Sequence, residues 1–75
     1  MIMSASTAIK QRLADLKINQ IELANMLGIT KQNLNNKLQR DNFSSQELDQ
    51  ICKVLNMKLI MVDEGKHEYL IQYDK

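Results

Sequence analysis

Apolar residues recur along the first three quarters of the chain at the spacing of amphipathic helices. Ile9, Leu13 and Leu16 stand at i, i+4 and i+7, which predicts a helix over residues 6–16. Similar stripes predict three further helices, over residues 20–27, 31–39 and 45–55. The positions predicted to be buried in these three helices are Leu23, Ala24, Leu27, Leu34, Leu38, Leu48, Ile51, Cys52 and Leu55.

Residues that begin and end helices lie between these stripes. Asn19 and Glu22 have the spacing of a capping box, and Ser44 repeats it with an acidic residue three positions later. Thr30 is a suitable N-cap for the third helix. Gly28 follows the last periodic residue of the second helix, where a left-handed backbone favours glycine. These signals support the four helices independently of hydrophobicity.

The period changes after residue 56. Residues 58–62 (KLIMV) and 69–73 (YLIQY) are short β-prone runs on either side of a polar segment that contains Gly65. The pattern predicts a β-hairpin over residues 57–75 with Gly65 in its turn, although a helix over 57–62 has the same apolar count. We expect a mainly α fold, in which four helices within residues 1–56 and this hairpin form one domain.

Composition places the chain among small globular domains. It has 75 residues, of which 44% are hydrophobic and 25% charged. Cys52 is the only cysteine, which excludes an intramolecular disulfide and is typical of a reducing compartment. No apolar run approaches the roughly 20 residues of a membrane span, and the first residues lack the layout of a signal peptide. We therefore expect a cytoplasmic protein without a membrane partner.

Charge is distributed unevenly. Residues 1–40 contain six basic and two acidic side chains, whereas residues 41–75 contain four basic and seven acidic ones. The net charges of the two halves, +4 and −3, sum to the overall +1. The asymmetry predicts an anionic partner for the N-terminal half.

The third predicted helix concentrates the polar side chains. Two short helices with a glycine at the bend form a helix-turn-helix. After the buried leucines are set aside, the outward positions of the third helix are Lys31, Gln32, Asn35, Asn36 and Lys37. Gln and Asn can bond adenine bidentately, and Lys can reach guanine O6 and N7. This chemistry suits the major groove of DNA.

The stretch QIELANMLGITKQNLNNKL, residues 20–38, resembles the helix-turn-helix of the phage-repressor family, also called Cro/CI-like or XRE. The resemblance covers about residues 5–56, and its matching residues are Gln20, Glu22, Leu23, Ala24, Leu27, Gly28, Ile29, Thr30 and Leu34. It implies a lambda-repressor-like fold and double-stranded DNA binding by a homodimer, usually to repress transcription.

The resemblance also implies roles for individual positions. The expected base-reading residues are Lys31, Gln32, Asn35 and Asn36. The expected contacts to the DNA backbone are Gln20, Thr30, Lys37, Arg40, Asn42, Ser44 and Ser45. Phosphate contacts would set register and affinity, and base contacts would set sequence choice.

The C-terminal segment departs from the family, which commonly ends in a fifth, dimer-forming helix. Here the tail is acidic and hairpin-like, and its apolar side chains exceed what one small hairpin can hide. We hypothesise that it forms the dimer contact through Leu59, Met61, Tyr69 and Ile71.

Enzymatic chemistry is not expected. The chain has no Ser-His-Asp arrangement, no phosphate-binding glycine loop and no clustered carboxylates in a plausible cleft. His67 is the only histidine, and with its neighbouring glutamates it is too little for a zinc site, so we expect neither metal nor cofactor. The alternative function is a protein-interaction module on a helix-turn-helix scaffold, such as an antitoxin or inhibitor, which could also regulate its own gene.

Overall fold

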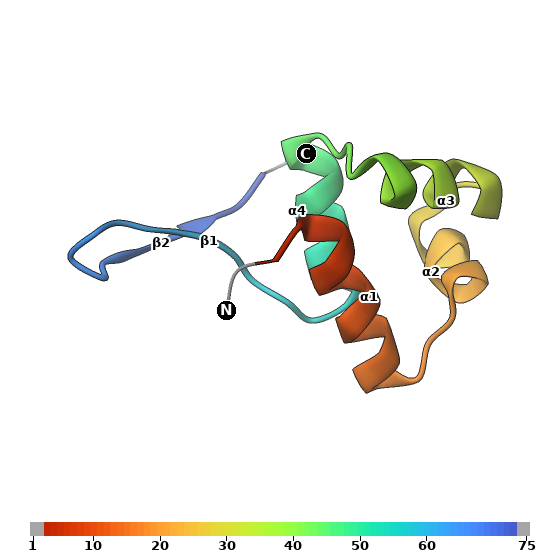
Figure 1. The fold of residues 1–75 in the computed structure, drawn as a ribbon, viewed down its shortest axis with the longest axis horizontal. Helices are drawn as coiled ribbons and strands as arrows, with labels where there is room; N and C mark the ends of the chain where they lie inside the picture. The colour runs from red at the N-terminus through yellow and green to blue at the C-terminus, as the bar shows by residue number, and fades with distance from the viewer. Residues whose placement is uncertain (1–2, 74–75) are drawn as a thin grey trace. The chain divides into compact units, whose positions relative to one another are not determined.

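The computed structural model describes residues 3–73, which form four helices followed by a two-stranded hairpin (Figure 1). The elements are α1 (Ala5–Leu16), α2 (Gln20–Leu27), α3 (Lys31–Arg40), α4 (Ser45–Val54), β1 (Leu59–Val62) and β2 (Glu68–Ile71). This confirms the predicted mainly α fold with a C-terminal hairpin. The chain divides into two compact units between Phe43 and Ser44, so that α1–α3 belong to the first and α4 with the hairpin to the second.

Each helix begins at a side chain that accepts a hydrogen bond from a backbone N–H three residues later. The predicted caps Asn19, Thr30 and Ser44 all have this role, and the first and last of them form complete capping boxes. For α1 the cap is Ser4, which accepts from the Thr7 N–H at 3.1 Å. The helix therefore starts one residue earlier than predicted.

A residue with a left-handed backbone stands directly after α1, α2 and α3, and another stands two residues after the end of α4. These residues are Lys17, Gly28, Asp41 and Asn56, with φ between 51° and 72°. After α1, α2 and α3, the residue that follows the left-handed one donates its backbone N–H to a carbonyl five residues back, as Ile29 does to Ala24 at 3.0 Å. Only one of the four positions is a glycine, so the residue type indicated the left-handed position after α2 alone, although the apolar period also placed the end of α1 correctly at Leu16.

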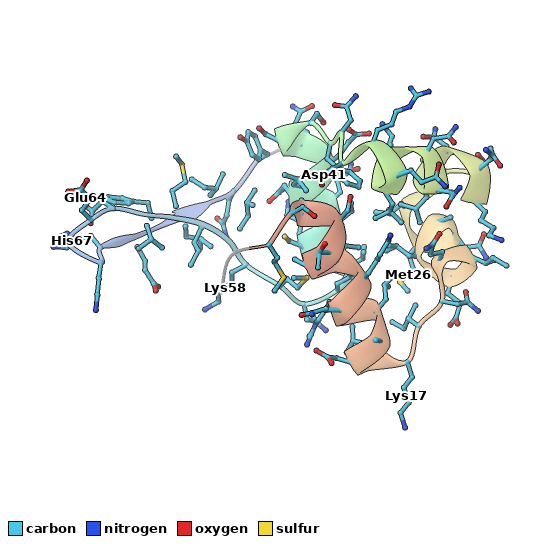
Figure 2. All side chains as sticks on the ribbon, in the orientation of Figure 1. Lys17, Met26, Asp41, Lys58, Glu64 and His67 are labelled. Carbon is cyan, nitrogen blue, oxygen red and sulfur yellow. The ribbon has the colours of Figure 1, made fainter. Side chains whose placement is uncertain are left out.

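Replacing Lys17 with glycine should stabilise the protein. Lys17 ends α1 at φ 57° and projects from the end of the helix (Figure 2). A left-handed residue with a Cβ costs about 1–2 kcal/mol, whereas glycine costs about 0.4–1 kcal/mol in unfolded-chain entropy. The net gain in unfolding free energy should be about 0.5–1 kcal/mol by urea denaturation. Lys10→Gly, inside α1, is the matched control and should destabilise; a loss from both changes would contradict the prediction.

The core of the first unit is aliphatic. It consists of Ile9 and Leu13 from α1, Leu23 and Ala24 from α2, and Leu34 and Leu38 from α3, all buried. Leu16, Leu27 and Ile29 are half-buried around it. The small Ala24 is 1% exposed, consistent with the direct contact between α2 and α3. The predicted apolar stripes of these helices thus face one another.

A polar link, which the sequence pattern did not indicate, joins the start of α1 to the end of α3. Ser6 is buried; its hydroxyl donates to the Leu38 carbonyl at 2.6 Å, and its backbone N–H donates to the Asp41 carboxylate at 2.9 Å. The serine hydroxyl therefore adds a second donor to a carbonyl in the last turn of α3, which also accepts the Asp41 N–H at 3.3 Å. This contact ties the C-terminal end of α3 to α1.

The second unit begins with α4. Its Ile51 and the following Leu55 are buried as predicted, whereas Leu48 and Cys52 are only half-buried. Burial, with a smaller contribution from Asp49, raises the pKa of the Cys52 thiol. Asp49 is itself buried and pairs with Lys53 at 3.0 Å. Cys52 is thus less enclosed than the expected core position.

The hairpin pairs antiparallel in the register Leu59↔Ile71, Ile60↔Leu70, Met61↔Tyr69 and Val62↔Glu68. A hairpin rather than a helix thus follows residue 57, with shorter strands than the predicted runs 58–62 and 69–73. The predicted dimer residues share one face, where Leu59 and Ile71 are half-buried and Met61 and Tyr69 are exposed. Ile60, Val62 and Leu70, on the other face, are also exposed and were not predicted as contacts.

The hairpin turn places its left-handed residue at Lys66, with φ 67°, rather than at Gly65. The Lys66 N–H donates to the Asp63 carbonyl at 3.0 Å, closing a three-residue loop. A Cβ at position 65 would lie 3.0 Å from the His67 ring, so glycine serves the approach of that side chain. The His67 N–H bond to the Asp63 carboxylate is the largest contribution lowering the pKa of Asp63.

Candidate nucleic-acid interface

The candidate interface is built on α2 and α3, which are joined by only three residues. The Asn19 side chain accepts from the Glu22 N–H at 2.8 Å and fixes where α2 begins. At the other end, Gly28 turns the chain with φ 72°, and Thr30 accepts from the Asn33 N–H at 3.0 Å to begin α3. The sequence pattern thus defines both ends of the helix-turn-helix bend.

The predicted base-reading residues lie away from the core on α3. Leu34 and Leu38 anchor the helix, at 0% and 3% exposed. Lys31, Gln32 and Asn36 are exposed, whereas Asn35 is half-buried. Because only Leu34 and Leu38 of α3 are buried, most of the circumference of the helix remains available to polar side chains.

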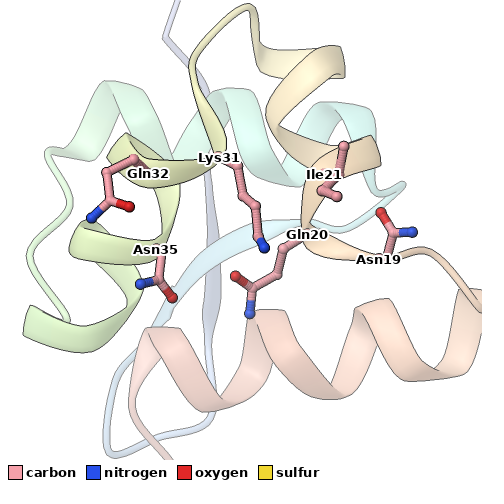
Figure 3. A pocket seen from close by; sticks show the side chains of 6 residues that line it. All are labelled: Asn19, Gln20, Ile21, Lys31, Gln32 and Asn35. Carbon is pink, nitrogen blue, oxygen red and sulfur yellow. The ribbon is translucent and has the colours of Figure 1, made fainter.

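A hollow of about 460 Å³ lies between the N-terminal ends of α2 and α3 (Figure 3). It brings the predicted phosphate contact Gln20 together with the predicted base readers Lys31, Gln32 and Asn35. Two residues that the prediction missed also line it, Asn19 and Ile21. Ile21 is half exposed, so an aliphatic surface stands among amide groups at the edge of the hollow.

A second, smaller hollow of about 230 Å³ lies along α3 and the residues that follow it. It joins the predicted base reader Asn36 to the predicted backbone contacts Lys37, Arg40 and Asn42. Asn33 completes the lining and was not predicted. The spacing of positions 33, 36, 37 and 40 is that of one helical face, so helical periodicity counted from Arg40 could have identified it.

Two of the base-reading candidates are bonded to each other. The Gln32 side-chain amide donates to the Asn36 side-chain oxygen at 3.2 Å, one helical turn away. Such a bond restricts the rotamers of both side chains before any partner arrives. It leaves the Gln32 carbonyl oxygen as an acceptor and the Asn36 amide group as a donor, the pair of functions that an adenine edge requires.

The other predicted backbone contacts are at helix starts. Thr30 is exposed and its oxygen caps α3, which leaves its hydroxyl hydrogen as a donor. Ser44 and Ser45 are both exposed at the beginning of α4, in the second compact unit. The first-turn N–H groups of a helix favour an anion.

Residues 3–73 contain neither a candidate membrane span nor a candidate metal-binding cluster. None of the helices in this range combines the length and the hydropathy needed to cross a membrane. The same residues contain no group of three or more His, Cys, Asp or Glu side chains that could hold a metal ion.

The chain was compared with known proteins and families. The family model described as the Cro/C1-type HTH DNA-binding domain matches residues 8–60, more than half of the 75 residues. Comparisons with curated proteins and with solved structures gave no match. The family match confirms the predicted resemblance and double-stranded DNA as the partner class, and domains of this type are DNA-binding regulators. The chain therefore belongs to the Cro/C1-type helix-turn-helix family of DNA-binding domains.

Proposed function

We propose that this protein is a sequence-specific transcriptional repressor that binds operator DNA as a homodimer and reads the major groove with α3. The observation that carries the proposal is the hydrogen-bonded pair Gln32 and Asn36 on the exposed side of α3, near Lys31. Amide and ammonium groups at these positions match the donors and acceptors on adenine and guanine edges. Because the two leucines of α3 face the core, its polar side can enter the groove without disturbing the packing of the core.

Each base reader has a distinct role. Gln32 and Asn36 act as a pair on one adenine or on neighbouring bases, because their mutual bond sets both orientations. Lys31, at the first position of α3, reaches guanine O6 and N7. Asn35 is half-buried in the first hollow and contacts a base from there.

The phosphate contacts hold α3 in register. Gln20 and Thr30 bind the backbone from the start of α2 and α3, and Lys37, Arg40 and Asn42 bind it from the second hollow. Ser44 and Ser45 add the first turn of α4. The basic charge of residues 1–40 supports this assignment, because affinity for DNA is dominated by phosphate neutralisation.

The homodimer would present two α3 helices to successive major grooves, about 34 Å apart, on an inverted repeat. Its proposed contact is the hairpin face of Leu59, Met61, Tyr69 and Ile71. Exposed apolar side chains on a short hairpin support this assignment, since an isolated two-stranded hairpin is marginal in water.

Lys37→Ala should weaken binding to operator and to random duplex alike. If Lys37 neutralises one phosphate, its removal should reduce the slope of log affinity against log salt by about 0.9 per protomer. Fluorescence anisotropy at several salt concentrations measures this slope. Lys10→Ala removes the same charge from an exposed position of α1 and should leave the slope unchanged. A loss confined to the operator would instead assign Lys37 to base reading.

The proposal as a whole is tested by selecting binding sites from a random duplex library with the purified protein. An enriched inverted repeat, bound with steep salt dependence, would support a dimeric sequence reader. Weak binding to every duplex without enrichment would refute sequence-specific repression, and transcription from a reporter carrying the selected site would separate repression from activation.

A further inference from the structure

Ile21 is an aliphatic residue of the helix-turn-helix that core packing does not account for. It is the second residue of α2 and is 50% exposed. The buried side of α2 is formed by Leu23 and Ala24, which are 0% and 1% exposed. Because Ile21 precedes Leu23 by two residues, the two side chains are about 200° apart around the helix. Ile21 therefore points away from the core.

Helix propensity does not explain an isoleucine at this position either. A β-branched side chain loses rotamer freedom in a helix, so glutamate, glutamine or lysine would form the first turn of α2 more readily. Single exposed apolar side chains are common on proteins, and Met26, 45% exposed on the same helix, is one. Ile21 differs from Met26 in its surroundings.

Ile21 lines the hollow of about 460 Å³ between the starts of α2 and α3, whereas Met26 lines neither hollow. Figure 3 shows Ile21 on the α2 side of this hollow and Gln32 and Asn35 on the α3 side. All the other side chains that line the hollow end in an amide or an amine: Asn19, Gln20, Lys31, Gln32 and Asn35. One aliphatic surface thus lies beside the groups proposed to contact DNA.

The edges of the DNA bases offer a partner for such a surface. In the major groove the base pairs are distinguished by hydrogen-bond donors and acceptors and by one apolar group, the C5-methyl of thymine. Amide and ammonium groups gain nothing from a methyl group, whereas an aliphatic side chain gains the free energy of removing both apolar surfaces from water. Each adenine that Gln32 and Asn36 could read is paired with a thymine, which brings this methyl group into the same groove.

The phosphate contact proposed for Gln20 brings Ile21 to the right part of the groove. In thymine, C5 adjoins C6, and C6 adjoins the nitrogen that carries the sugar. The methyl group therefore lies on the side of the base edge that is nearest to its own backbone. Gln20 immediately precedes Ile21 and lines the same hollow. Ile21 is thus placed for a methyl group on the strand whose phosphate Gln20 binds.

We propose that Ile21 is a specificity-determining residue that packs against the C5-methyl group of a thymine in each half-site, on the strand whose phosphate Gln20 binds. The contact favours thymine over cytosine, which lacks this methyl group. The inference rests on the proposed function and adds to it a residue of α2 and the base that it reads.

Replacing single thymines of the selected operator with deoxyuridine tests the contact, because uracil keeps the hydrogen-bonding groups of thymine and lacks only the methyl group. At one position of the half-site, the replacement should weaken binding by about four-fold per methyl group, or about 16-fold when both half-sites carry it. Fluorescence anisotropy measures the affinities. Selected half-sites without thymine, or binding that is insensitive to uracil at every position, would overturn the inference.

The Ile21→Ala variant identifies the side chain responsible. It should bind the thymine operator about 16-fold more weakly than the original protein does, and should bind the thymine and uracil operators within about two-fold of each other. On the uracil operator it should match the original protein within about two-fold, which shows that its fold and its other contacts are intact.

Met26→Ala is the matched control, since it truncates an exposed apolar side chain of the same helix outside both hollows. It should keep the full difference between the thymine and uracil operators. A uracil effect that persists in Ile21→Ala would assign the methyl group to another side chain and overturn the proposal. An equal loss on both operators would do the same, because it would place Ile21 against the sugar-phosphate backbone.

These outcomes are separable from those of the proposed function. A selected inverted repeat that shows no uracil effect would overturn the methyl contact and leave the proposed repressor intact. The absence of any selected site would overturn both, because the contact presupposes a sequence-specific operator.

Discussion

Leu34→Ala should lower the free energy of unfolding by about 2–5 kcal/mol. Leu34 is fully buried on α3, and its removal leaves a cavity that a small core collapses around only partly. A chain of 75 residues has a total stability of only about 4–11 kcal/mol, so the change removes a large share of it. Urea denaturation followed by circular dichroism measures the loss, provided that the m value, the slope of unfolding free energy against urea concentration, is unchanged.

Ile21→Ala is the control for this loss. Ile21 is half exposed on α2, and alanine has the higher helix propensity, so the change should stay within about 0.5 kcal/mol. Equal costs for the two substitutions would contradict the placement of Leu34 in the core. Because Leu34 holds α3 from the side opposite to Gln32 and Asn36, the same variant should also weaken DNA binding in proportion to its unfolded fraction.

The helix-turn-helix was predictable because the features that begin, end and orient its helices lie within a few residues of one another in the sequence. A side chain three residues from its backbone partner defines the start of α2 and of α3, and Gly28 defines the bend. The leucines repeat at helical spacing, so Leu34 and Leu38 identify the buried side of α3 without knowledge of the tertiary structure. Outward residues then follow by elimination.

What the sequence did not reveal depends on residues that are far apart or on backbone angles that tolerate several residue types. Ser6 bonds to Leu38 and Asp41, more than thirty positions away, and no periodicity records such a pair. Lys17 and Lys66 take left-handed angles that usually indicate glycine.

Gln32→Ala should weaken operator binding by about 1–3 kcal/mol, about 5- to 150-fold, and relax sequence preference at one position of each half-site. The side chain supplies a base contact and also holds Asn36 through the 3.2 Å bond between their amides. Its removal therefore costs the contact and frees Asn36 to rotate. Binding to random duplex should change little, since no charge is lost.

Coupling between Gln32 and Asn36 distinguishes a paired reading unit from two separate contacts. If they act as a unit, the double alanine variant should lose less than the two single losses combined, by about 0.5 kcal/mol or more. Gln39→Ala, the same substitution at another exposed α3 position, should leave affinity and selected sequence unchanged. Anisotropy titrations on operator and random duplex measure every term. If the losses in binding free energy of the two single variants add up to that of the double variant, Gln32 and Asn36 make separate contacts. If Gln32→Ala weakens binding equally to operator and random duplex, Gln32 does not read a base. A residue that discriminates between bases must matter more where its own base is present.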